Sequence, residues 1–295
     1  MTIKRIAFVG IGNMGWPMAA NLVKAGFDVS ISDAAPGRAD QFAKEVGGTS
    51  GHGGNVDAVV TILPTSKHVA SVMAEMAPSL QAGTLVIDMT SGQPTVTAEL
   101  AATLAAQGVA MVDCPVSGGV TRARTGELAI MAGGDTVALD RAEPVLRAMG
   151  TTIHRCGPIG AGQAMKALNN LVSAGGFLIG IEALLIGRRF GLDPALMVDV
   201  LNASTGMTNS SQKKFKQFVL SRQFNSGFGL DLMAKDLSIA LEVGRETGTP
   251  TPFAALCRVM WASAAVLLGP GQDHTAVAKL SEQLAATALG GNVEP

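Results

Sequence analysis

The sequence predicts an α/β fold: an N-terminal doubly wound sheet and an all-α C-terminal domain, joined by a long helix. Two observations carry this prediction. Short apolar runs alternate with helix-length segments as far as Gly157, and beyond Gly162 only helical patterns follow. The Gly- and Pro-rich stretch 157–162 is the expected junction, so we expect one domain over residues 1–162 and a second over 163–295.

The expected strands are apolar runs that end in polar or turn residues. They are 3–9, 27–32, 58–63, 84–89 and 109–113. Helix-length segments between strands imply parallel pairing through right-handed crossovers. Ligands of such sheets bind at the carboxyl ends of the strands, so the loops that follow these runs are the candidate site.

The second half contains helical periodicity bounded by Gly, Pro, Asn and Asp. The longest pattern is 163–190, and shorter ones follow at 194–203, 209–219, 229–246, 252–268 and 273–287. No strand pattern is evident there. This half is expected to form the substrate and oligomerisation domain.

The composition restricts the possible functions. The 295 residues are 47% hydrophobic and 15% charged, with a net charge of −1, which disfavours disorder and a nucleic-acid partner. Three cysteines far apart fit neither disulfides nor a metal pattern, so we expect buried thiols and no metal. The chain enters a strand pattern at once, and no uninterrupted membrane span is apparent. A cytoplasmic location without a membrane partner is therefore expected.

A glycine-rich turn connects the first strand to the first helix. Gly10, Gly12 and Gly15, with Asn13 and Met14 between them, form a Gly-x-Gly-x-x-Gly string. Between a strand and a helix, this string is typical of turns that bind a dinucleotide pyrophosphate. The alternative is a glycine-rich turn without a ligand.

Asp33 ends the second strand and is placed to accept hydrogen bonds from an adenosine ribose. Its charge would repel a 2′-phosphate, so NAD is favoured over NADP. A turn-initiating aspartate is the alternative interpretation. Arg38 could weaken the preference for NAD if its side chain folds back.

Beyond these residues, four segments of the chain resemble the β-hydroxyacid dehydrogenases, the family of 3-hydroxyisobutyrate dehydrogenase. The segments are 10–22, 113–134, 160–170 and 232–237, in the order and spacing of that family. The resemblance implies an N-terminal Rossmann-type domain, a helical C-terminal domain like that of 6-phosphogluconate dehydrogenase, and a homodimer or homotetramer. It also implies hydride transfer between NAD(H) and a small 3-hydroxy acid or its semialdehyde.

The resemblance assigns roles to individual residues. Lys166 would be catalytic and Asn170 would position the substrate. Residues that would bind the substrate carboxylate are Ser117, Gly118 and Gly119. Residues that would touch the cofactor are Leu63, Pro64, Ser91 and Lys235, with Asp236 alongside the last.

The residues themselves agree with this chemistry. Oxidising an alcohol requires a base, and Lys166 follows a glycine turn and begins an apolar helix, where burial favours the neutral amine. Asn170 is one helical turn further along the same face. The turn at Ser117 can hold a carboxylate, and Arg122 just beyond it can bind a second acidic group or pair with Glu127.

Two other interpretations stay open. An imine reductase could share this architecture, although such relatives usually lack a lysine at the position of Lys166. A non-catalytic nucleotide-binding module is the second alternative, and Lys166, Asn170, Ser117 and Gly118 together disfavour it. The identity of the hydroxy acid does not follow from the sequence.

Overall fold

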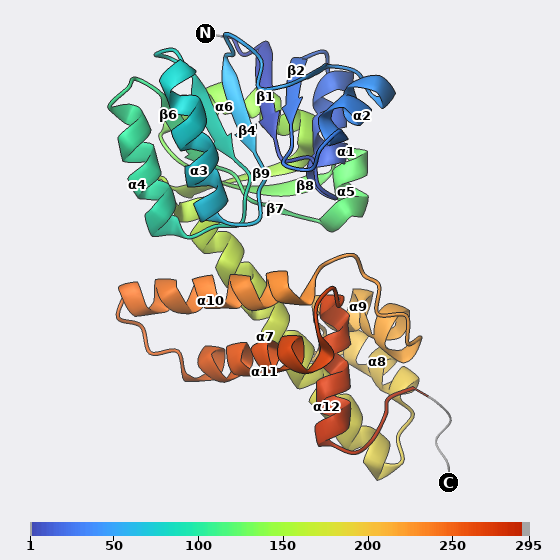
Figure 1. Ribbon diagram of the computed structural model, residues 1–295. Helices are drawn as coiled ribbons and strands as arrows, with labels where there is room; N and C mark the ends of the chain where they lie inside the picture. The colour runs from blue at the N-terminus through green and yellow to red at the C-terminus, as the bar shows by residue number, and fades with distance from the viewer. Residues whose placement is uncertain (1, 291–295) are drawn as a thin grey trace. The chain divides into compact units, whose positions relative to one another are not determined.

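The computed structural model describes residues 2–290 and divides into two compact units, Met1–Lys166 and Ala167–Pro295. The expected boundary, between Gly162 and Gln163, lies just before this division. The α/β class of the first unit and the helical character of the second are as predicted (Figure 1).

The first unit is built on one sheet, in the order β3-β2-β1-β4-β5-β6-β8-β7, with β9 beside β8. Its first six strands are β1 (Arg5–Val9), β2 (Asp28–Ser32), β3 (Thr49–Ser50), β4 (Ala58–Thr61), β5 (Leu85–Asp88) and β6 (Ala110–Asp113). Every pairing among these six is parallel, which confirms the predicted parallel pairing. All five predicted runs are strands, with ends shifted by one or two residues.

Four strands were not predicted. They are the two-residue β3 on the edge of the sheet, β7 (Val116–Ser117), β8 (Leu128–Gly133) and β9 (Gly150–Gly157). β8 runs antiparallel to β6 and β7, and β9 pairs with β8 in parallel. The sheet is therefore mixed at this end. β9 lacks the apolar run of a central strand because most of its residues are exposed.

Both faces of the sheet are buried. On β1, Ile6 and Phe8 belong to one core cluster and Ala7 and Val9 to another, as expected when side chains alternate between two covered faces. One face packs against α1 (Gly15–Lys24) and α6 (Thr136–Met149), the other against α3 (Ser66–Met76) and α4 (Pro94–Ala105). The remaining helices of this unit are α2 (Arg38–Glu45), the 3-10 helix η1 (Ala77–Ser79) and α5 (Gly119–Thr125).

The long helix predicted after the junction is α7 (Ala161–Phe190). The helices that follow are α8 (Pro194–Asn202), α9 (Asn209–Lys213), the π-helix η2 (Phe215–Leu220), α10 (Leu230–Glu246), α11 (Pro252–Leu268), the 3-10 helix η3 (His274–Val277) and α12 (Ala278–Leu284). Among the described residues of this unit no strand occurs, and one isolated bridge joins Gly229 and Asp273. The single helix predicted over 209–219 is instead α9 and η2, separated at Lys214.

By length and composition alone, α7 could cross a membrane, contrary to the expectation of no such span. Half of its most apolar window is buried inside the protein. Core helices of soluble proteins meet the same criterion, so this is weak evidence for a membrane.

Candidate active site

The glycine turn follows β1, and two of its glycines are required by the protein itself. Gly10 has φ +95°, and a Cβ there would collide with the carbonyl oxygen of Ile62 and lie 2.8 Å from Cδ2 of Leu63. A Cβ at Gly15 would collide with the carbonyl oxygen of Gly10. These two glycines therefore permit the tight turn and the close packing of α1 against it.

Gly12 is different. It is exposed, its φ is outside the left-handed region, and a Cβ built on it would meet no atom within 4 Å. Neither the backbone conformation nor the packing of this chain requires glycine at position 12. An open glycine before the N-terminus of α1, where unpaired N–H groups point outward, fits the close approach of a dinucleotide pyrophosphate.

Asp33 lies directly after β2 and binds the glycine turn. Its Oδ2 accepts a hydrogen bond from the backbone N–H of Ile11 at 2.8 Å, and its Oδ1 accepts from Ala35 at 2.8 Å. Asp33 thus initiates a turn and also stabilises the glycine turn. Because each carboxylate oxygen accepts more than one hydrogen bond, the half-buried carboxylate can still accept from ribose hydroxyls.

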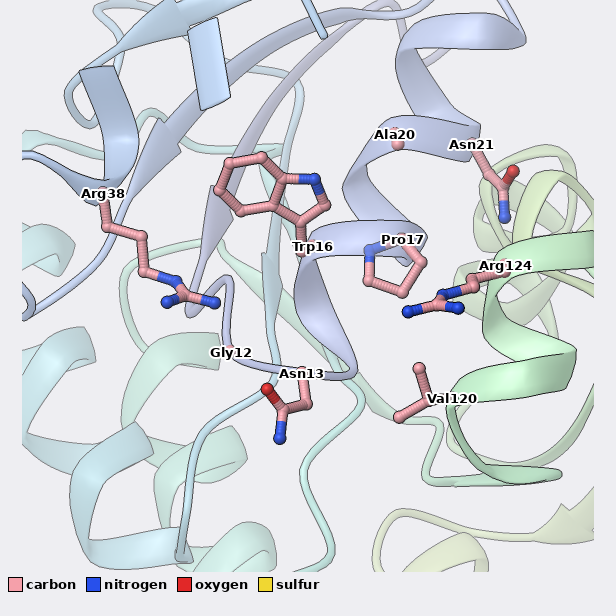
Figure 2. A pocket seen from close by; sticks show the side chains of 9 residues that line it. All are labelled: Gly12, Asn13, Trp16, Pro17, Ala20, Asn21, Arg38, Val120 and Arg124. Atoms are coloured by element: carbon pink, nitrogen blue, oxygen red, sulfur yellow. The ribbon is translucent and has the colours of Figure 1, made fainter. Parts of the chain in front are cut away.

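Arg38 does fold back toward the glycine turn. Its Nε donates to the carbonyl oxygen of Ile11 at 2.7 Å, and its guanidinium lies 5.6 Å from the centre of the Trp16 ring. A cavity of about 460 Å³ adjoins this contact (Figure 2). Its lining residues are Gly12, Asn13, Trp16, Pro17, Ala20, Asn21, Arg38, Val120 and Arg124.

The loops after β4 and β5 lie at the same edge of the sheet. The N–H of Leu63 donates to Oγ1 of Thr90 at 3.0 Å, which ties the two loops together. The side chain of Leu63 also packs beside Gly10. Pro64 is exposed and Ser91 is half-buried. The structure thus brings Leu63 beside the glycine turn and keeps Pro64 and Ser91 in the adjoining loops.

Two buried carboxylates behind these loops were not predicted as site residues. Asp88 is fully buried and accepts hydrogen bonds from Oγ1 of Thr61 (2.8 Å), N of Thr90 (3.0 Å) and Nε2 of Gln163 (3.1 Å). Burial raises its pKa to about 6. Burial also raises the pKa of Asp113, against the opposing effect of backbone N–H bonds.

The carboxylate-binding turn predicted at Ser117 requires its two glycines. Ser117 belongs to β7, and Gly118 and Gly119 have φ values of +135° and +67°, in a region that L side chains rarely adopt. The aliphatic part of Arg122 lies over Gly118, since a Cβ there would be 2.7 Å from Cδ of Arg122. The stem of Arg122 therefore covers Gly118, whereas a Cβ built on Gly119 would meet no atom within 4 Å.

The charge of Arg122 is available to a ligand. Its side chain is exposed, and within the described chain no ion pair involves it. The alternative of pairing with Glu127 is not observed among the ion pairs of the described residues; Oε2 of Glu127 instead accepts from Oγ1 of Thr125 at 2.8 Å.

Lys166 lies in the second turn of α7 and is 8% exposed. In the helical unit, Asn170 is 6% exposed and its Nδ2 donates to Oδ2 of Asp236 at 2.6 Å. Nζ of Lys235 lies 3.2 Å from Oδ1 of Asp236. Asp236 therefore joins α7 to α10. The sequence alone placed Asp236 beside Lys235 and did not predict its bond to Asn170.

The three cysteines are free thiols; Cys114 and Cys257 are buried as expected, whereas Cys156 is half-buried. Among residues 2–290, no group of three or more His, Cys, Asp or Glu side chains could hold a metal ion.

Two family models match the chain. The first, described as the NAD binding domain of 6-phosphogluconate dehydrogenase, covers residues 5–157. The second, described as NAD-binding of NADP-dependent 3-hydroxyisobutyrate dehydrogenase, covers residues 160–281.

Curated relatives match over nearly the whole chain. The 2-(hydroxymethyl)glutarate dehydrogenase of Eubacterium barkeri is 34% identical over 97% of this chain and 98% of its own. The NAD-dependent L-serine dehydrogenase of Pseudomonas aeruginosa is 33% identical over 94% of this chain and 98% of its own.

Among solved structures, a 3-hydroxyisobutyrate dehydrogenase of Mycobacterium tuberculosis with L-serine has a TM-score of 0.88 at 33% identity, over 95% of this chain and 99% of its own. An imine reductase of Streptomyces aurantiacus, at 17% identity with a TM-score of 0.62, over 94% of this chain and 99% of its own, shares the fold alone.

The mixed sheet, the glycine turn and the helical second unit define a two-domain, dinucleotide-dependent oxidoreductase. Matched over nearly its whole length, the chain belongs to the β-hydroxyacid dehydrogenase family.

Proposed function

We propose that this protein oxidises a small 3-hydroxy acid to its semialdehyde with NAD, and catalyses the reverse reduction, with Lys166 transferring the proton. The observation that carries the proposal is the buried Lys166 amine on α7, four residues before an Asn170 amide that Asp236 holds in place. The open Gly12 supports dinucleotide binding at the start of α1.

When bound, NAD accepts a hydride from the alcohol carbon. The neutral amine of Lys166 takes the hydroxyl proton, and its ammonium form returns a proton in the reverse direction. Asn170 orients the reacting oxygen because its amide cannot rotate without losing its bond to Asp236. Ser117 and the backbone of Gly118 and Gly119 bind the substrate carboxylate.

The relatives suggest a common substrate pattern. Serine, 3-hydroxyisobutyrate and 2-(hydroxymethyl)glutarate are all HOCH2–CH(R)–COO−, where R is an amino, methyl or carboxyethyl group. We propose that this chain acts on the same pattern and that Arg122 favours an R group bearing a negative charge. The unpaired guanidinium beside the carboxylate-binding turn supports this preference.

Initial rates with a panel that varies only R test the proposal. The methyl, amino and carboxyethyl compounds, each with NAD and with NADP, should all be alcohol substrates of a dehydrogenase. Reduction of cyclic imines without alcohol turnover would favour the imine reductase alternative. Binding of NAD without turnover of any compound would favour a non-catalytic module.

The Arg122→Ala variant tests the role of the arginine. We expect kcat/KM for the carboxyethyl substrate to fall about tenfold or more, as for a lost charge-assisted hydrogen bond, with little change for the methyl substrate. Arg124→Ala, on the same helix but lining the cavity beside the glycine turn, is the control and should change kcat/KM for both substrates by the same factor. Equal losses for both substrates would remove Arg122 from substrate selection.

A homo-oligomer and a cytoplasmic location stay predictions. Large apolar side chains at Val172, Ile179 and Ile186 recur every seven residues on α7 and are exposed, which supports self-association through this helix.

A further inference from the structure

The first turn of α7 is capped by a side chain from a distant strand. Oδ1 of Asp113, at the end of β6, accepts from the N–H of Gly160 at 2.7 Å, and Oδ2 accepts from the N–H of Gln163 at 2.8 Å. Helix N-termini leave such N–H groups unpaired, and the preceding residue usually supplies the cap. Gly160 has no side chain, so the carboxylate of Asp113 takes that role.

The space around this carboxylate allows only glycine at two positions. A Cβ at Gly133, the last residue of β8, would lie 2.5 Å from Oδ1 of Asp113 and 2.8 Å from N of Gly162. A Cβ at Gly162 would lie 2.9 Å from Oδ2 of Asp113. Strands β6 and β8 and the start of α7 therefore meet at the Asp113 carboxylate, and none can shift without breaking these contacts.

A second connection fixes the rotation of the same turn. Nε2 of Gln163 donates to Oδ2 of Asp88 at 3.1 Å and lies 3.0 Å from Oγ1 of Thr97, and all three side chains are buried. Gln163 is therefore held both by its backbone and by its side chain. Lys166 follows three residues later, less than one helical turn along α7.

We propose that Asp113 is a positioning residue for the reaction: by capping α7 it sets the place at which Lys166 presents its amine. This inference rests on the proposed function of Lys166. Proton transfer needs donor and acceptor within hydrogen-bond reach, and a displacement of about 1 Å can cost about 100-fold in rate. A cap built into the sheet restricts such displacement.

The test compares Asp113→Asn with Asp135→Asn. An asparagine at 113 places an NH2 group against one of the two backbone N–H groups. Asp135 is the matched control because it caps α6 in the same unit, with its Oδ1 accepting from the N–H groups of Val137 and Ala138. For each variant, kcat and its pH profile, the Kd for NAD, the melting temperature and amide hydrogen exchange over 160–170 are measured.

For Asp113→Asn we expect faster exchange over 160–170, kcat lowered about tenfold to 100-fold, a displaced pH profile of kcat, and a Kd for NAD within about twofold of the parent. Asp135→Asn should lower only the melting temperature. If Asp113→Asn does not fold, Gln163→Met removes the side-chain connection to Asp88 and should shift kcat and its pH profile in the same direction, by a smaller factor.

The outcomes separate the two proposals. If Lys166→Ala is inactive but Asp113→Asn keeps the parent kcat and pH profile, or leaves exchange over 160–170 unchanged, then Asp113 is only structural and the inference is overturned. If Lys166→Ala is itself active, the proposed function fails first, and the positioning role fails with it.

Discussion

The amide of Asn170 and the carboxylate of Asp236 form a buried 2.6 Å hydrogen bond between α7 and α10. A carboxylate can only accept at this distance from an amide, so Asn170 must turn its NH2 group toward Asp236. Its Oδ1 in turn accepts from Nδ2 of Asn169 at 3.2 Å. The orientation of the Asn170 amide is therefore determined by its partners, and Lys235 pairs with the other oxygen of the same carboxylate.

Asp236→Asn should impair catalysis while keeping the shape of the side chain. The variant removes the charge opposite Lys235 and lets the Asn170 amide rotate, so we expect kcat/KM to fall about tenfold, the equivalent of one charge-assisted hydrogen bond. Steady-state kinetics check this. Asp231→Asn, an exposed aspartate on the same helix, is the control and should be unchanged. Parent-like kinetics for Asp236→Asn would show that the orientation of Asn170 is irrelevant to turnover.

Lys166→Ala should lower kcat by about 1000-fold, within the range that general acid–base groups contribute. The Kd for NAD, followed by the fluorescence of Trp16 beside the glycine turn, should change less than about twofold. Lys166→Arg keeps the positive charge but cannot release a proton near neutral pH, and it should be as inactive as the alanine variant. Activity in the arginine variant would assign Lys166 a purely electrostatic role.

Asp33→Asn should shift cofactor preference toward NADP. The asparagine oxygen can still accept from the N–H of Ile11, but the charge that repels a 2′-phosphate is gone. We expect the Kd for NAD to rise about tenfold and the Kd for NADP to rise less or to fall, with Arg38 nearby to attract the phosphate. Asp40→Asn, exposed on α2, is the control. A parallel change for both cofactors would reject the ribose assignment.

Asp88→Asn should change the pH dependence of stability. The pKa of Asp88 is raised to about 6 by burial, so its stabilising contribution is complete below its ordinary pKa of 3.8 and is lost as the pH rises through 6. For a shift of this size the loss is about 3 kcal/mol. Asparagine does not titrate, so the variant lacks this loss of stability. Its melting temperature should therefore fall less than that of the parent between pH 4 and pH 7.

Asp57→Asn provides the opposite control for that measurement. The hydrogen bond and ion pair with Arg5 lower the pKa of Asp57 to about 2, so its contribution is present above pH 3.8 and is lost as the pH falls through 2. Its variant should therefore lose stability at neutral pH and not at pH 2. If Asp88→Asn and the parent show the same pH dependence, Asp88 titrates at its ordinary pKa.

Five parallel strands of the sheet, β1, β2, β4, β5 and β6, were predictable because they are short, mostly apolar runs that end in polar or turn residues. β8 is equally buried and apolar but was not predicted. Continuous apolar runs such as Ile6 to Val9 identify parallel strands without any tertiary information. β9 escaped prediction because its residues are mostly exposed, and its pairing with β8 depends on contacts that one segment does not encode. The short β7, only Val116–Ser117, is half-buried, and two residues are too few to form a recognisable strand pattern within the predicted loop.

Some residues of the candidate site could be predicted from the sequence, and others are revealed only by the folded structure. The glycine turn, Asp33 and the Lys166–Asn170 spacing are local patterns, so the sequence alone predicts them. The contacts of Asp113 with α7 and of Asp236 with Asn170 join residues 47 and 66 positions apart. A carboxylate carries no local sign of such a partner, and only the folded chain reveals it.

Gly12 differs from its neighbours in the source of the constraint on it. Gly10 and Gly15 are required by the fold of the protein itself. Gly12 is constrained only by the bound cofactor, because a methyl group at that position would meet no atom of the protein. A descendant of this gene that abandoned its cofactor could therefore accept mutation at residue 12 long before it lost the ability to fold. A substitution at residue 12 would therefore be an early sign that a related protein no longer catalyses the reaction.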